Sequence, residues 1–217
     1  PRLLSSAASD VYKRQTIDFV DHHQPGDPGF GGPPEKFWTS SSLGQVWARL
    51  RPDSNPPESL QIIAAADHCP HAAYIGDCPG IDPGSVIAFS AEQVAIGTGK
   101  SIKDILQGVY RYIHKFRKFE PTEQHGSLVY RREGNPLTEH EWLLFREAAL
   151  WHGVAVISPV SPPNSSDVWI KMAGHTTAEL VRQFMYNRGL DEETPLDRVY
   201  GDPHRGYAGG LKVPPSS

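Results

Sequence analysis

Cysteine is scarce in this sequence, and long apolar runs are missing. Only Cys69 and Cys78 occur among 217 residues, which excludes a disulfide-rich scaffold and a four-cysteine zinc site. No apolar run approaches the roughly 20 residues that span a bilayer, and no signal peptide is recognisable. We therefore expect a soluble, cytoplasmic protein without a membrane partner. The oligomeric state and any role of the two cysteines stay open.

An excess of positive charge is also missing. The chain has 21 Lys and Arg against 25 Asp and Glu, for a net charge of -4. This balance argues against long nucleic acid as a partner, although a local basic patch stays open. Hydrophobic residues make up 38% of the chain, which is enough for a packed core. The 20 Pro and 20 Gly indicate that much of the chain is loop.

Residues 1–15 lack the periodicity of a helix or a strand. The stretch Ser5–Gln15 resembles translated sequencing-adapter tails, so we expect residues 1–15 to be a non-native or disordered tail. A flexible native N-terminus is the alternative. In either case we expect the ordered fold to begin near Thr16.

The first half of the chain has mainly the spacing of helices. A β-branched and aromatic run at Thr16–Val20 predicts one buried strand. Ser101, with Asp104 three residues later, is predicted to cap the most amphipathic helix. The predicted helices cover about 42–50, 60–66, 86–95 and 101–119. The last has an apolar stripe formed by Ile102, Ile105, Leu106, Val109, Ile113 and Phe116.

The second half alternates strands and helices, and Pro121–Gly126 is the best candidate for a domain boundary. Two capping boxes, Thr138-x-x-Glu141 and Thr176-x-x-Glu179, predict helices, the second ending near Gly189. Strands are predicted at Ser127–Arg131, Val154–Ser158, Val168–Met172 and from Leu211. This β-α-β-β-α-β order indicates an α/β unit whose sheet is covered by helices.

Three potential metal ligands, Asp21, His22 and His23, stand at the end of the first predicted strand. Ligands of open α/β sheets gather at the carboxyl ends of strands. A carboxylate with two imidazoles suits a divalent transition metal such as Mn²⁺, Fe²⁺ or Zn²⁺. A polar loop whose histidines form local hydrogen bonds is the alternative.

A further acidic residue, Asp67, follows the apolar run Ile62–Ala66 and is flanked by His68 and His71. On one continuous helix Asp67 and His71 would share a face. Pro70 makes that continuation uncertain. A helix-terminal role for Asp67 and a surface role for the histidines are the alternatives.

The third constellation is the glycine-rich segment Gly201–Gly210. Closely spaced glycines let backbone amides approach an anion, and Arg205 can bind a phosphate through two hydrogen bonds. A plain turn before the last strand is the alternative.

These motifs together resemble the DHH phosphoesterase superfamily. The resemblance is carried by Asp21-His22-His23 after a strand, by the Ser-rich helix start at Ser41–Trp47, and by the apolar helix before Asp67. Gly201–Gly210 resembles the Gly-Gly-His-x-x-Ala-Gly loop of the DHHA1 domain, from which Asp202 and Pro203 depart. The resemblance implies an α/β fold, with an incomplete DHH-like parallel-sheet domain over 16–120 and a smaller DHHA1-like lobe over 121–217.

The resemblance also implies an activity, namely metal-dependent hydrolysis of a phosphoester or phosphodiester in a nucleotide-like or other small phosphate substrate. The expected cofactor is Mn²⁺, with Mg²⁺, Fe²⁺ and Zn²⁺ as alternatives. Asp21, His22 and Asp67 are the expected metal ligands, and His22 and His23 the expected catalytic residues. The expected substrate-binding residues are His23, His68, Gly201, His204, Arg205, Gly209 and Gly210.

The sequence departs from the family pattern in one respect. The family has an Asp-x-Asp motif and a further Asp before the Asp-His-His, and neither is found here. We therefore expect this chain to be a fragment that is inactive by itself. Two other functions stay open. One is a phosphate- or nucleotide-binding module without catalysis, and the other is a mononuclear metalloenzyme of another class that uses Asp21, His23, Asp67 and His68.

Overall fold

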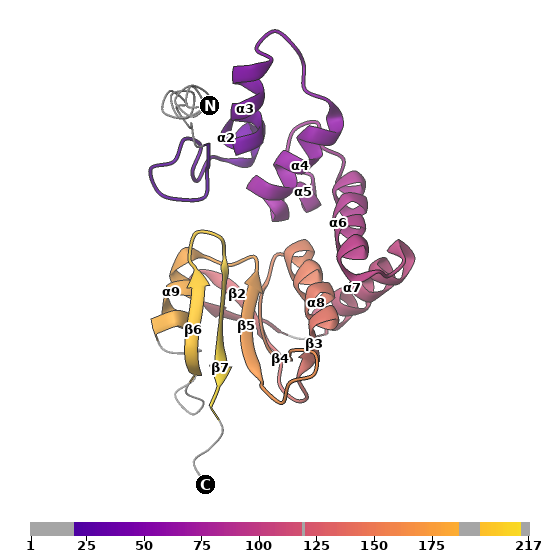
Figure 1. Cartoon of the computed structure of the whole chain (residues 1–217), viewed down its shortest axis with the longest axis vertical. Coiled ribbons are helices and arrows are strands. Elements are labelled where there is room, and N and C mark those ends of the chain that lie inside the picture. The colour runs from indigo at the N-terminus through magenta and orange to yellow at the C-terminus, as the bar shows by residue number, and fades with distance from the viewer. Residues whose placement is uncertain (1–19, 119, 187–195, 214–217) are drawn as a thin grey trace, which may run out of the picture.

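The computed structural model describes residues 20–118, 120–186 and 196–213, and in these ranges the fold is mixed α/β (Figure 1). The first half contains η1 (Pro34–Lys36), α2 (Phe37–Ser40), α3 (Ser42–Leu50), α4 (Glu58–His68), α5 (Pro70–Ile75), α6 (Pro83–Thr98) and α7 (Ile102–Phe116). The second half contains β1 (Thr122–Gln124), β2 (Ser127–Arg131), β3 (Leu137–Thr138), α8 (Glu139–His152), β4 (Ala155–Ser161), β5 (Trp169–Gly174), α9 (Ala178–Tyr186), β6 (Leu196–Asp202) and β7 (Tyr207–Lys212).

The sheet belongs to the second half and is mostly antiparallel. Its strand order is β1-β2-β4-β5-β7-β6, with β3 beside β4. The pairs β2–β4 and β3–β4 are parallel, and the other four pairs are antiparallel. None of the helices in the described ranges has both the length and the apolar character needed to cross a membrane.

A parallel-sheet domain was predicted for the first half, and residues 20–118 do not form one, since they contain no strand. The apolar residues of these segments recur at helical spacing, and they pack helix against helix instead of covering a sheet. Residues 16–19 of the predicted strand Thr16–Val20 lie outside the described residues, as do residues 1–15, and Val20 is in a loop. The α/β class is correct, whereas the parallel arrangement is wrong for the described residues.

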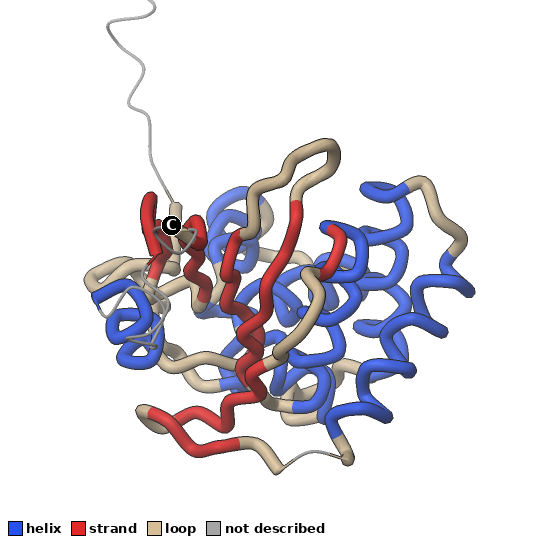
Figure 2. Tube along the Cα trace, turned by 90° about the horizontal axis from the view of Figure 1, so that it is seen from below, coloured by secondary structure: helices blue, strands red, loops and turns tan. Residues whose placement is uncertain are grey.

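Strand β4 shows how the second half builds two layers of helices around its sheet. Alternate residues of a strand point to opposite faces. Ala155 and Ile157 pack in one cluster with buried residues of α9, whereas Val156 and Val160 pack in another with α7 and α8. Helices α8 and α9 therefore cover opposite faces of the sheet, as Figure 2 shows from below. The first half has its own smaller core, formed mainly by α4, α5 and the loop that follows α5.

Most predicted helix starts are confirmed because they depend on contacts within one turn. The Thr138 and Glu141 capping box is present in full, and Ser101 accepts a hydrogen bond from the backbone of Asp104. Helix α9 differs, since Thr177 and not Thr176 caps it, through a 3.2 Å bond from the Leu180 amide. Its predicted end near Gly189 lies outside the described residues.

The predicted linker Pro121–Gly126 is part of the sheet. It holds β1 and the two-residue turn of a hairpin, in which His125 and Gly126 both have positive φ. Helix α7, which corresponds to the predicted helix 101–119, packs against α8, since Ile105 and Val109 share a core cluster with Phe145. Ile102, placed in its apolar stripe, is 45% exposed. A domain boundary at residue 120 stays a prediction.

The glycine-rich segment is not a single turn. Strands β6 and β7 form a hairpin across it, and Gly209 and Gly210 lie inside β7. A Cβ atom at Gly209 would lie 2.6 Å from the hydroxyl of Tyr200, and one at Gly210 would lie 2.9 Å from Leu196 Cβ. These two glycines are needed because bulky side chains of β6 cross them.

Candidate metal centre

Asp21 organises the loop that carries the two histidines. Its Oδ1 atom accepts hydrogen bonds from the backbone amides of His22 and His23, at 2.7 and 3.3 Å, and from Nδ1 of His23 at 2.5 Å. The bond from the His23 ring is the main cause that lowers the pKa of Asp21 to about 2. A proton on Nδ1 of His23 leaves its Nε2 atom with a free lone pair.

His22 is the most buried member of the group, with only 3% of its side chain exposed. Its Nδ1 atom lies 2.7 Å from the hydroxyl of Ser42 and 3.1 Å from the backbone nitrogen of Ser42. Its Nε2 atom is buried and has no hydrogen-bond partner among the described residues. Burial first, and then the charge of His23, lowers the pKa of His22 below its usual value of 6.5, so the neutral ring is favoured.

Asp67, in the last turn of α4, joins these residues although more than forty positions separate them in the sequence. Its Oδ1 atom lies 3.5 Å from Nε2 of His23, and its Oδ2 atom lies 3.8 Å from Nε2 of His22. The carboxylate side chain is 54% exposed, so it faces solvent on its other side. The fold therefore brings the four predicted residues to one place.

These distances suit a bound divalent ion. Two atoms bonded to one ion at about 2.1 Å and separated by the tetrahedral angle lie about 3.4 Å apart. The distance between His23 Nε2 and Asp67 Oδ1 is 3.5 Å. Asp21, His22 and His23 can also each offer one ligand atom such that all three lie within 4.8 Å of one another. The buried, unpartnered Nε2 of His22 adds a donor that otherwise has nothing to bind.

His68 and His71 lie next to this group but are held by other contacts. Nε2 of His68 lies 2.9 Å from the carbonyl of Gly32, and its Nδ1 atom is buried without a partner. Helix α4 ends at His68 and α5 begins at Pro70, so Asp67 and His71 do not share one helix. Nδ1 of His71 lies 2.9 Å from the carbonyl of Leu150, which ties α5 to α8.

The two cysteines form a pair of thiols beside the site, with their sulfur atoms 3.0 Å apart. Burial raises the pKa of both Cys69 and Cys78. Uncharged thiols are poor metal ligands, because the thiolate is the binding form. Cys78 packs in the core of the first half, and Cys69 lies against that core.

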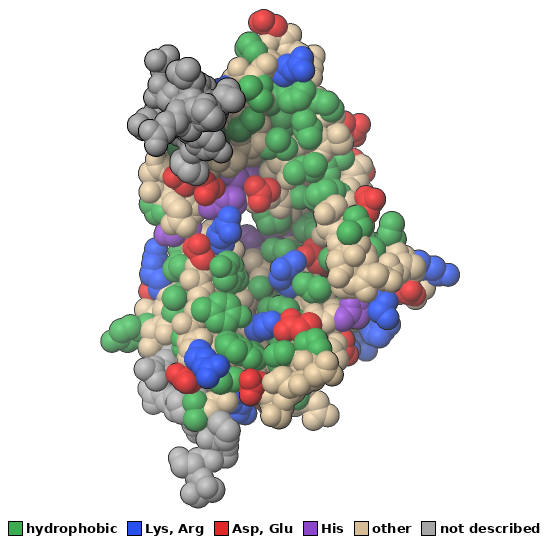
Figure 3. All heavy atoms as spheres, viewed as in Figure 1, with side chains coloured by type: hydrophobic (Ala, Val, Ile, Leu, Met, Phe, Trp, Pro, Cys, Tyr) green, Lys and Arg blue, Asp and Glu red, His purple; other side chains and the backbone are tan. Residues whose placement is uncertain are grey.

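A pocket of about 770 Å³ lies between the histidine cluster, formed by His22, His23 and His68, and the second half of the chain. Figure 3 shows histidine and acidic side chains gathered at the hollow between the helical part and the sheet. His22, His23, Asp67 and His68 line the pocket from the first half. His175, Thr176 and the hairpin turn 203–207 line it from the second half.

The hairpin turn faces the histidine cluster, with His204, Arg205 and Gly206 in the pocket lining. The Phe30 ring contacts the His204 ring edge to face, with centroids 5.3 Å apart. Nε2 of Gln24 donates to the carboxylate of Asp202 at 3.3 Å, so the loop after the Asp-His-His touches the hairpin directly.

The predicted anion-binding role of the glycine-rich backbone is not supported by its hydrogen bonds. The amides of His204 and Arg205 donate to the side chain of Asp202, at 2.9 and 3.2 Å, and the amide of Gly206 donates to its carbonyl. The turn satisfies its own donors, which leaves side chains such as Arg205 to meet an anion. Gly201, Gly209 and Gly210, predicted to bind substrate, lie in strands and do not line the pocket.

Three residues of the site were not predicted. Ser42 was recognised only as a helix start, although the paired serines Ser41 and Ser42 could have suggested a second role. Thr176 has a buried hydroxyl oxygen without a partner, next to the pocket. His175 carries no motif around it, so nothing in the sequence could have placed it there.

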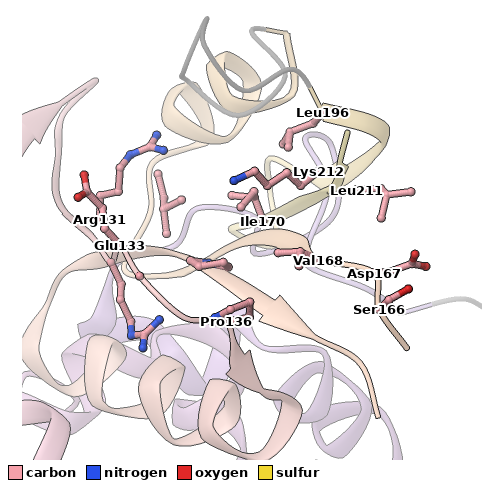
Figure 4. Close-up of a pocket in the computed structure, with 14 residues that line it drawn as sticks. Arg131, Glu133, Pro136, Ser166, Asp167, Val168, Ile170, Leu196, Leu211 and Lys212 are labelled. Atoms are coloured by element: carbon pink, nitrogen blue, oxygen red, sulfur yellow. The ribbon is translucent and has the colours of Figure 1, made fainter. Parts of the chain in front are cut away.

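A second pocket, of about 760 Å³, lies over the part of the sheet that includes Ile170 and Leu211 (Figure 4). Arg131 and Lys212 line it together with apolar side chains. It contains none of the residues predicted to bind metal or substrate, so the first pocket is the candidate site.

Comparison of the chain with protein-family models, with curated proteins and with solved structures gives no match. The proposed function is therefore derived from the contacts among His22, His23 and Asp67 and from the pocket that these residues share with the hairpin.

Proposed function

We propose that this chain belongs to a metal-dependent phosphoesterase of the DHH type, which hydrolyses a phosphoester or phosphodiester in a small, nucleotide-like phosphate substrate. The observation that carries the proposal is the approach of Asp67 to Nε2 of both histidines, at 3.5 and 3.8 Å. The mixed nitrogen and oxygen donors favour Mn²⁺, Fe²⁺ or Zn²⁺ over Mg²⁺, which prefers oxygen ligands.

In this proposal each residue has a defined task. Asp21, His22 and Asp67 would hold the ion, and Oδ1 of Asp21 also orients His23 through its Nδ1 proton, as carboxylates commonly do for metal-binding histidines. His23 then either binds the ion with the Nε2 lone pair or, when both ring nitrogens carry a proton, donates from Nε2 to a phosphate oxygen. When bound, the ion supplies Lewis-acid activation of the phosphoryl group.

The substrate would lie between the cluster and the hairpin turn. Arg205 lines the pocket opposite the histidines, and a guanidinium group can form two parallel hydrogen bonds with a phosphate. His68 and His204 line the same space; the His204 ring can offer a hydrogen bond to the substrate, whereas Nε2 of His68 already meets the carbonyl of Gly32. The pocket volume of about 770 Å³ is within the usual range for small-molecule sites, which agrees with a small substrate.

Metal binding tests the proposal directly. Calorimetry with Mn²⁺ should show saturable binding to the 217-residue chain and at least about a 100-fold loss of affinity for Asp67→Asn, because the amide removes the charge that pairs with the cation. Asp77→Asn is the matched control, since Asp77 lines the same pocket, whereas the contacts with His22 and His23 belong to Asp67. Absence of Mn²⁺, Fe²⁺ and Zn²⁺ binding would reject the phosphoesterase and leave a phosphate-binding module.

A mononuclear metalloenzyme is the second candidate. One observation favours a single ion, although through His22 instead of Asp67 and His68: among the described residues, Asp21, His22 and His23 form the one group of at least three possible metal ligands whose ligand atoms lie within 4.8 Å of one another. The number of Mn²⁺ ions bound per chain, together with release of nitrophenol from bis-nitrophenyl phosphate, separates the two. One ion with activity in this chain favours the mononuclear enzyme.

A further inference from the structure

One ring nitrogen of His22, Nδ1, lies close to two groups of Ser42, its hydroxyl and its backbone amide. Nδ1 of His22 lies 2.7 Å from Oγ of Ser42 and 3.1 Å from the backbone nitrogen of Ser42. The other ring nitrogen, Nε2, is buried, has no hydrogen-bond partner and lies 3.8 Å from Oδ2 of Asp67. The contacts at Nδ1 therefore determine what Nε2 can do inside the site.

The Ser42 amide, which donates to Nδ1, requires one tautomer of His22, whereas the Ser42 hydroxyl can donate or accept and so allows either. A backbone N–H can only donate, so against it Nδ1 must be without a proton, and a neutral ring then carries its proton on Nε2. A hydroxyl can accept, so against it Nδ1 can hold the proton and Nε2 keeps its lone pair. Only the second tautomer can bind a cation at Nε2.

We propose that Ser42 is a positioning residue, whose hydroxyl accepts the Nδ1 proton of His22 and so leaves Nε2 free for the metal ion. The role of the metal ion in this inference rests on the proposed function, but the contact between Ser42 and His22 exists without the ion. The hydroxyl distance is the shorter of the two, at 2.7 Å, and is typical of a strong hydrogen bond.

The neighbouring serine shows why two serines stand together at the start of α3. Ser41 is the N-cap, and its Oγ atom accepts the amide of Gly44 at 3.1 Å. Ser42 occupies the first turn of α3, where backbone amides lack partners within the helix. The Ser42 amide, 3.1 Å from Nδ1 of His22, favours the tautomer with the proton on Nε2, which cannot bind a cation there. The Ser42 hydroxyl offsets this effect by accepting the proton of Nδ1.

The test compares Ser42→Ala with two controls in the 217-residue chain. Ser42→Thr keeps the hydroxyl, and Ser41→Ala removes the helix cap but leaves the His22 contact in place. Two-dimensional ¹H–¹⁵N spectra of the metal-free proteins report which ring nitrogen of His22 carries the proton, and His22→Gln assigns that signal by its loss. Zn²⁺ affinity is measured by calorimetry on the same samples.

We expect the proton on Nδ1 in the wild type, in Ser42→Thr and in Ser41→Ala, and on Nε2 in Ser42→Ala. Zn²⁺ affinity should fall about 10- to 100-fold in Ser42→Ala, the usual effect of removing the partner of a metal-binding histidine. Ser42→Thr should retain wild-type affinity, and Ser41→Ala should lose stability without losing affinity.

The same proton position in the wild type and in Ser42→Ala would overturn the inference, even if both proteins bind Zn²⁺ equally well. A tautomer change without Zn²⁺, Mn²⁺ or Fe²⁺ binding in the wild type would support the role of Ser42 and reject the proposed function. The experiment therefore distinguishes failure of the proposed role of Ser42 from failure of the proposed function.

Discussion

Replacing Glu147 should loosen the attachment of helices α5 and α6 to the sheet half. Glu147 lies on α8 with only 11% of its side chain exposed. Its Oε2 atom accepts a 2.9 Å hydrogen bond from the hydroxyl of Tyr74 on α5 and a 2.6 Å bond from Ser90 on α6. Burial is the main cause that raises the pKa of Tyr74, so its hydroxyl stays a donor at neutral pH.

The expected magnitude follows from these partners. Glu147→Ala removes a carboxylate that accepts from Tyr74, Ser90 and the half-exposed Arg146, and an unpaired buried group costs about 1–3 kcal/mol. We expect a loss of about 2–4 kcal/mol in the free energy of unfolding. Tyr74→Phe removes a single donor and should cost about 1 kcal/mol, because the shared acceptor keeps Ser90.

Urea denaturation measures both variants and also gives the m-value. Glu92→Ala is the matched control, because Glu92 is an exposed residue of α6 and its loss should change stability by less than about 0.5 kcal/mol. If Glu147→Ala unfolds within about 0.5 kcal/mol of the wild type, this carboxylate does not hold the two halves together.

Three further predictions concern single residues. Gly174→Ala should destabilise the protein by at least about 2 kcal/mol in urea denaturation, because Gly174 has φ +103 and a Cβ would lie 2.5 Å from the Val154 carbonyl oxygen; an unchanged midpoint would contradict this. Glu141 has its pKa lowered, mainly by the Thr138 amide, so its stabilisation is present above its usual pKa of 4.5 and is lost as pH falls below it. The free energy of unfolding, measured from pH 6 to 3, should fall less in Glu141→Gln than in the wild type. Equal losses in the two proteins would refute the assignment of this pH dependence to Glu141. In the active protein, Arg205→Ala should lower kcat/KM by an amount that corresponds to about 2–4 kcal/mol of lost transition-state stabilisation, without changing metal content. Loss of metal would assign Arg205 to the fold instead.

Helix starts and strand positions could be predicted because they depend on residues that are close in the sequence. The capping box of Thr138 and Glu141 operates within one turn, and β2 forms at the predicted range Ser127–Arg131. Cap assignments fail where two candidates adjoin, as Thr176 and Thr177 do, because the choice depends on the path of the preceding loop. The glycine-rich segment shows the limit of local reasoning, since Gly209 and Gly210 are required by side chains that approach from β6.

The sequence by itself determined which chemical groups are available: a carboxylate and two imidazoles in one tripeptide, a second carboxylate at a helix end, and an arginine in a glycine-rich segment. Only the tertiary structure decided their partners. It brings Asp67 to His22 and His23, places Ser42 on the opposite ring nitrogen of His22, and joins His175 to the same pocket. The physical reason is that caps and strand faces depend on neighbouring residues, whereas a ligand cluster depends on how α3, α4 and the hairpin pack.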